Sequence, residues 1–181
     1  MQRPELRQAE ARFRVDRRAI AGAIAYEALD NIFLSPVFGL TRSAGPGKVH
    51  YKEDYFREGD PAAKQVEDRG ILPRQTLATR RQLLMTAKGS ITYIAAIMSA
   101  LSVVARKGGG YSLTCDPAAL VTLYDGWDLP SATGLFRRKH SPEPMVVNKA
   151  GEWVALNLGS LTDAVGEPAK LCKGPPPLNL Y

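Results

Sequence analysis

The chain has 181 residues, of which 45% are apolar, and its formal net charge at pH 7 is +6. That length fits one globular domain with a sizeable core, and the two cysteines, Cys115 and Cys172, are too few for a disulfide scaffold or a zinc site. The positive charge favours an acidic partner, such as nucleic acid, a membrane surface or an anionic cell-wall polymer.

The basic residues are scattered along the chain. Two short clusters, Arg80-Arg81 and Arg137–Lys139, are more typical of solvated faces than of binding patches. No basic stretch is interleaved with aromatic residues in the manner of a nucleic-acid reader, so we expect no nucleic-acid partner. The two cysteines leave two alternatives open: one bridge in an oxidising compartment, or two buried thiols.

No segment has the pattern of a targeting or membrane-spanning element. The N-terminal residues Met1–Arg7 lack the apolar core of a secretory signal. The most apolar run, Ile91–Ala105, is shorter than a bilayer span and contains several polar residues. We therefore expect a soluble protein with no integral membrane segment. If it acts outside the cytoplasm, another route must deliver it.

The chain begins with two expected helices. Residues 4–15 carry Pro4 in a first turn and a weak apolar stripe. Either this helix runs on into the next, over residues 17–30, or it breaks near Asp16, which could cap the second helix.

The second helix carries the first candidate for chemistry. Its small residues let neighbouring elements pack closely, so it should lie in the middle of the domain. One helical face holds Ile20, Ala23, Ile24 and Glu27. Glu27 ends this buried stripe, where desolvation would raise the pKa of its carboxyl and make it a plausible general acid. The alternative is an exposed or salt-bridged Glu on an ordinary amphipathic helix.

A glycine-containing loop follows. Ser35-Pro36 should end the helix, and Gly45 and Gly47 flank Pro46 in a tight turn that brings bare backbone close to whatever lies opposite. Because the loop comes directly after the candidate acid, it could form the wall of a site. The alternative is a plain surface turn.

The rest of the chain is predicted to form further helices. They are expected over residues 61–70, 77–85, 89–106, 118–124 and 148–165. Asp60, Thr76 and Asp116 are placed to cap the first, second and fourth of these. The third is apolar on much of its circumference and should be a second central helix.

Strand signals are brief, near residues 47–51 and 145–147. We therefore predict a mainly α protein of six or seven helices. Residues 1–170 should form a single domain, and residues 171–181 a Pro-rich C-terminal tail.

Metal and thiol chemistry receive little support. His50 and His140 lack a helical ligand pairing, so we expect no metal site and no cofactor. A thiol nucleophile is an alternative, because Cys115 lies at a helix start, where thiol pKa values fall, and His50 could be its base.

Three segments in order resemble motifs of the lysozyme-like superfamily, in particular lytic transglycosylases and goose-type lysozymes. They are Ala23–Ala28, Gly45–His50 and Leu123–Gly126. In that family a catalytic Glu closes a small-residue helix, a Gly-rich loop follows, and a Tyr-Asn turn lies later. The resemblance covers residues 17–127, with 89–98 similar to the family's long central helix.

The chain departs from the family pattern at three places. Ala28 stands where the family has Ser, and Asp125 stands where it has Asn. The Gln of the loop is absent, with Lys48 and His50 nearby instead. Ala28 removes a hydroxyl that would orient the Glu.

The resemblance implies a lysozyme-like helical domain with a substrate groove, which cleaves the β-1,4 bond between N-acetylmuramic acid and N-acetylglucosamine in peptidoglycan. Glu27 would be the general acid and base. The residues implied to contact substrate are Gly45, Gly47, His50, Tyr51, Tyr124 and Asp125. A second carboxylate, if one is used, would be Asp30, Glu53 or Asp54.

A wall-cleaving enzyme without a signal peptide suggests an antibacterial effector, a toxin that a secretion system delivers to the periplasm of a target cell, or a phage lysin. An effector would have a cognate immunity protein as inhibitor. The alternative is a non-catalytic wall-binding or structural module on a lysozyme-like scaffold.

Overall fold

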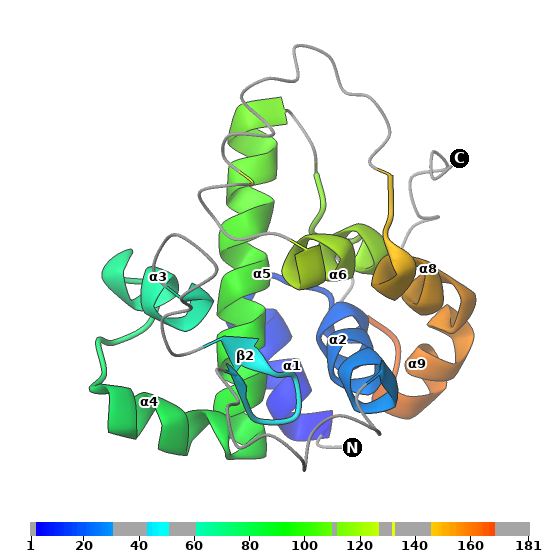
Figure 1. The fold of residues 1–181 in the computed structure, drawn as a ribbon. Helices are drawn as coiled ribbons and strands as arrows, with labels where there is room; N and C mark the ends of the chain where they lie inside the picture. The colour runs from blue at the N-terminus through cyan, green and yellow to red at the C-terminus, as the bar shows by residue number, and fades with distance from the viewer. Residues whose placement is uncertain are drawn as a thin grey trace.

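A computed structural model describes residues 3–30, 43–50, 61–109, 112–126, 132 and 146–168. Within them the fold is mainly helical, which confirms the predicted class (Figure 1). The helices are α1 (Arg3–Phe13), α2 (Arg17–Asp30), α3 (Ala62–Asp68), α4 (Leu77–Leu84), α5 (Ala87–Gly109), α6 (Pro117–Gly126), α8 (Lys149–Leu156) and α9 (Leu158–Val165). Two short antiparallel strands, β1 (Ser43–Ala44) and β2 (Val49–His50), form a hairpin in which Ser43 pairs with His50.

Helix α5 is the longest element and runs through the centre of the fold (Figure 1). It packs against α1, α3, α4, α6 and β2, and its inner face holds fully buried residues such as Ile94, Met98 and Leu101. It begins before the expected start at residue 89 because Thr86 caps it, accepting a hydrogen bond from the Gly89 backbone N–H at 3.0 Å.

By length and composition alone, residues 87–108 of α5 would suffice to cross a membrane. In this protein 61% of that stretch is buried by the surrounding elements, as is typical of a core helix. The helix is longer than the expected range of residues 89–106 because it begins directly after the Thr86 cap and continues through Gly109.

Helix α2 packs against five neighbours, α1, α5, α6, α8 and α9, as its small residues predict. A Cβ atom added to Gly22 would lie only 2.7 Å from the Cγ2 atom of Val154 on α8. Asp16 breaks the chain between α1 and α2, and its Oδ1 atom accepts a hydrogen bond from the Arg18 backbone N–H at 2.8 Å. Of the two alternatives, a break near Asp16 with a second helix capped by Asp16 is correct, and a continuous helix is wrong.

Two other predicted caps are present. Thr76 accepts from the Thr79 backbone N–H at 3.2 Å, and Asp116 accepts from the Ala119 backbone N–H at 3.0 Å. At the start of α3 the cap position is held by Pro61, without a side-chain bond, and Asp60 lies outside the described residues.

The single helix expected over residues 148–165 is wrong. It is broken at Asn157 into α8 and α9. The Asn157 side-chain amide donates to the Trp153 carbonyl at 2.8 Å, and its backbone leaves the helical region at φ −104° and ψ 13°. An Asn side chain that competes for helical carbonyls in this way favours a helix end.

Candidate functional site

The candidate acid, Glu27, lies where α2 emerges from the core. Residues Ala19–Ala23 are buried, Ile24 to Glu27 are half-buried, and Leu29 is 52% exposed. Glu27 as a residue is thus partly shielded and partly exposed to solvent. Such a position suits a proton donor better than full burial or full exposure does.

The hairpin turn after α2 is wedged between helices. Gly45 has φ +78°, and a Cβ atom there would lie 2.0 Å from the Leu84 carbonyl oxygen. A Cβ atom on Gly47 would lie 2.3 Å from Cδ1 of Ile94 and 3.6 Å from Cγ1 of Ile24. Bare backbone is therefore required at both positions, and the turn touches the same α2 stripe that Glu27 ends.

Tyr124, at the end of α6, joins this turn. Its hydroxyl donates a hydrogen bond to the Gly47 carbonyl oxygen at 2.6 Å. The pKa of Tyr124 is raised well above its usual value, first by burial and then by the negative charges of Glu27 and Asp125. Tyr124 is therefore bonded to Gly47 and lies within electrostatic reach of Glu27, although 97 positions separate Glu27 from Tyr124 in the sequence.

Asp125 connects this corner to α8. It is exposed, and its Oδ2 atom accepts a hydrogen bond from Nδ2 of Asn148 at 2.7 Å. The Oδ1 atom of Asn148 in turn accepts from the Gly151 backbone N–H at 3.0 Å, which caps α8. Sequence analysis missed Asn148 as a site neighbour, although an Asn before a predicted helix is a cap signal.

An aromatic pair lies on the adjoining face of α2. The rings of Tyr26 and Trp153 have centroids 6.2 Å apart and are tilted by 55°. Both side chains are half-buried against the core. This tilted aromatic pair is one of the contacts between α2 and α8.

The remaining predicted site residues are placed only in part. Tyr51, Glu53 and Asp54 lie outside the described residues. His50 and Asp30 are described only as positions in β2 and α2, not by their side chains. Among the carboxylates that the structure describes, Asp125 and Glu27 are the two whose negative charges raise the pKa of Tyr124.

The thiol-nucleophile alternative is wrong, because Cys115 is disulfide-bonded and carries no free thiol. Cys172, the other cysteine in the sequence, lies outside the described residues. In the part of the chain that the structure describes, no three His, Cys, Asp or Glu side chains gather as a metal site would require.

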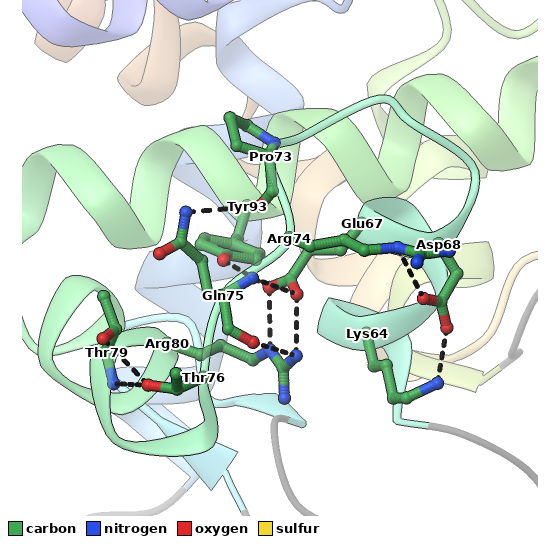
Figure 2. A network of polar contacts seen from close by, with 10 residues as sticks. All are labelled: Lys64, Glu67, Asp68, Pro73, Arg74, Gln75, Thr76, Thr79, Arg80 and Tyr93. Atoms are coloured by element: carbon green, nitrogen blue, oxygen red, sulfur yellow. Dashed lines mark hydrogen bonds and ion pairs between the residues drawn. The ribbon is translucent and has the colours of Figure 1, made fainter.

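A second polar cluster, which sequence analysis missed, joins α3, α4 and α5 (Figure 2). Glu67 accepts from Nε and Nη2 of Arg80, both at 2.7 Å, from the Tyr93 hydroxyl at 2.6 Å and from the Gln75 backbone N–H at 3.0 Å. Glu67 is 2% exposed and Tyr93 is 3% exposed. We call these three side chains, of Glu67, Arg80 and Tyr93, the buried triad.

The buried triad is suited to holding helices rather than to acid catalysis. Burial by itself would raise the pKa of Glu67, but the hydrogen bonds from Arg80 and Tyr93 outweigh it and hold the pKa below its usual value. A carboxylate in that state keeps its negative charge at neutral pH and has no proton to donate. The spacing of these residues in the sequence does not predict the cluster, because its members come from three different helices.

Comparison with known proteins adds no family assignment to this geometry. No family model, curated protein or solved structure that was compared with the chain matches it.

Proposed function

We propose that the protein cleaves the glycan strands of peptidoglycan at the β-1,4 bond between N-acetylmuramic acid and N-acetylglucosamine. The observation that carries the proposal is the hydrogen bond from Tyr124 to the Gly47 carbonyl oxygen, within electrostatic reach of Glu27. These residues belong to the three segments in which the sequence resembles lytic transglycosylases and goose-type lysozymes.

In the proposed reaction the protonated Glu27 carboxyl donates its proton to the glycosidic oxygen, and the C–O bond breaks as an oxocarbenium-like state forms. The resulting carboxylate then removes a proton from the attacking hydroxyl. With water as nucleophile the product has a reducing end. With the muramic acid 6-hydroxyl as nucleophile it has a 1,6-anhydro end.

In this proposal Tyr124 positions the hairpin beside Glu27. Its hydroxyl hydrogen is donated to Gly47, so it fixes the hairpin against α6 beside Glu27. In the proposal it is a positioning residue, and the exposed Asp125 remains a contact for sugar hydroxyls or for developing positive charge.

The disulfide at Cys115 supports action in an oxidising compartment, such as the periplasm of a target cell. A secreted or injected effector, with a cognate immunity protein as inhibitor, accords with that compartment. So does a phage lysin.

The test is the Glu27→Gln variant on purified sacculi, with mass analysis of the released products. We expect no release, because the amide cannot donate a proton to the leaving oxygen. Glu152→Gln is the matched control, since Glu152 is an exposed Glu on α8, and it should keep full activity. Full activity of Glu27→Gln, or equal loss in both variants, would overturn the mechanism.

A second candidate function is wall binding without cleavage. It is favoured by Ala28, which provides no hydroxyl to orient Glu27, and by the Tyr124 hydroxyl, which is already bonded to Gly47. Tight sacculus binding by the unaltered protein, with no soluble product, would select this function.

A further inference from the structure

Helix α4 presents a surface that the proposed site does not use. Large apolar side chains there are exposed without cover: Leu77 by 50%, Leu83 by 37% and Met85 by 65%. Three of the seven exposed large apolar residues of the described chain thus fall within nine positions. Leu83, two residues before Met85, points to nearly the opposite side of the helix. We call Leu77 and Met85, with the neighbouring cations, the α4 surface; it consists of Arg74, Leu77, Arg81, Met85 and Lys88.

The arrangement along the helix places cation and apolar groups together. Leu77, Arg81 and Met85 are spaced four residues apart, so they follow one line along the outer face of α4 and its C-cap. Arg81 and Lys88 are exposed, and within the described chain neither is paired with a carboxylate.

The charge around this surface has one sign over a long stretch. Residues 69–115 contain no Asp or Glu, and they carry seven basic residues. Of these, Arg106 and Lys107 lie at the far end of α5, away from α4. Arg80 is neutralised within the buried triad, and Arg74 lies 3.4 Å from Asp68, which leaves Arg69, Arg81 and Lys88. The remaining positive charge is not balanced locally, which is the charge pattern that an anionic surface complements.

The α4 surface is held in place from inside. Arg80 and Leu84 point inward from the same helix, Arg80 to Glu67 and Leu84 into the core at 0% exposure (Figure 2). Thr76 caps its start. Figure 1 shows α4 at one end of α5, on the outside of the molecule. The exposed side chains are therefore presented by a fixed helix.

We propose that the α4 surface docks the protein on an anionic lipid bilayer. Leu77 and Met85 enter the boundary between headgroups and acyl chains, while Arg81 and Lys88 meet lipid phosphates. Exposed Leu and Met side chains favour lipid over a nucleic acid, which would offer them no apolar phase. The inference does not depend on Glu27, because the two regions share no residue.

The test is flotation of the full chain with vesicles. We expect binding to vesicles that contain phosphatidylglycerol, weak binding to pure phosphatidylcholine, and release as salt rises. Arg81→Glu should lower partitioning to the anionic vesicles about tenfold or more, since it removes one positive charge and adds a negative one. Met85→Ser should lower it several-fold.

Two matched controls keep the test specific. Leu156→Ser removes an 86% exposed apolar side chain on α8, and Arg106→Glu reverses an exposed charge at the far end of α5. Both should leave partitioning within about twofold of the unaltered protein, with folding checked by circular dichroism. No binding to anionic vesicles, or equal loss in the controls, overturns the proposal. Equally tight binding to duplex DNA that Met85→Ser leaves unchanged would also overturn it, in favour of a polyanion site.

Discussion

Two tyrosines of this protein donate hydrogen bonds near a carboxylate, and the two regions differ in how that carboxylate is bonded and buried. Tyr93 donates to Glu67, whose oxygens also receive bonds from Arg80 and Gln75, and the carboxylate is sealed at 2% exposure. Tyr124 donates to a backbone carbonyl instead, and its neighbour Glu27 is half-buried.

The difference separates a structural carboxylate from a candidate catalytic one. In the buried triad the ion pair and hydrogen bonds outweigh burial, so the pKa of Glu67 falls. Beside Tyr124, the negative charge of Glu27 helps to raise the pKa of the phenol. A buried carboxylate is thus no sign of chemistry by itself. What matters is whether solvent and substrate can reach it.

The largest effect should come from breaking the buried triad. Arg80→Met leaves the Glu67 charge buried without its cation, which costs about 3–5 kcal/mol of unfolding free energy. Urea denaturation followed by circular dichroism measures it. The double variant Glu67→Gln with Arg80→Met should recover part of the loss, because it removes the stranded charge. A cost below about 1 kcal/mol for Arg80→Met would contradict this account.

The same triad has a pH signature. Because the folded-state pKa of Glu67 is lowered, its contribution to stability is full above the ordinary value of 4.5 and is lost as pH falls through the lowered pKa. Glu67→Gln should remove that acid dependence, as unfolding curves in urea at a series of acidic pH values would reveal.

The hairpin beside Glu27 can be tested with a pair of glycines. Gly45 and Gly70 have similar positive φ values, +78° and +71°, but only Gly45 has an obstacle, since an added Cβ atom would lie 2.0 Å from the Leu84 carbonyl oxygen. Each change to Ala costs about 1–2 kcal/mol for the left-handed backbone. Gly45→Ala should cost about 1–3 kcal/mol more, because backbone must shift. Equal unfolding free energies for the two variants would show that the turn is not wedged.

The two tyrosines themselves give a smaller effect. Tyr93→Phe removes a hydrogen bond to a charged group and should cost about 1.5–3 kcal/mol, whereas Tyr124→Phe removes a bond to a neutral carbonyl and should cost about 1 kcal/mol. If the proposed function is correct, only Tyr124→Phe should also slow the release of peptidoglycan fragments, when both variants are assayed under conditions in which they are fully folded. A reversed order in thermal or urea unfolding would contradict the comparison.

Local signals made much of the fold predictable from the sequence. Asp16, Thr76 and Asp116 are caps whose backbone partners lie within three residues, so pattern alone located the helices that follow them. The expectation that Glu27, Gly47 and Tyr124 share one site came from the resemblance and stays a prediction; of its contacts, the hydrogen bond between Tyr124 and Gly47 is present.

Other features depend on contacts that no spacing encodes. Glu67 meets Arg80 and Tyr93 only because α3 and α4 dock on α5. The expectation of a solvated face at Arg80-Arg81 is wrong for Arg80, which is 6% exposed and paired with Glu67, whereas Arg81 is exposed. The break at Asn157 was missed because the apolar pattern runs through it, while the bond to the Trp153 carbonyl that ends α8 is visible only in the structure.

The smallest predicted effect concerns Asp116, which begins the same helix that Tyr124 ends. Asp116 is 8% exposed, and burial raises the pKa of its carboxyl despite bonds from the Ala118 and Ala119 backbone N–H groups. The folded state therefore holds this proton more tightly than the unfolded state, so stability falls as pH rises from the ordinary value of 3.8 through the raised pKa.

Asp116→Asn keeps a good cap and removes the buried charge. The free energy of unfolding of Asp116→Asn, minus that of the unaltered protein, should be higher at pH 7 than at pH 3.5. The difference should be up to about 1 kcal/mol, measured by urea unfolding. Asp116→Ala, which loses the cap, should instead be destabilised at both pH values. A loss for Asp116→Asn that is larger at pH 7 than at pH 3.5 would mean that this carboxylate, like Glu67, is stabilised by its surroundings.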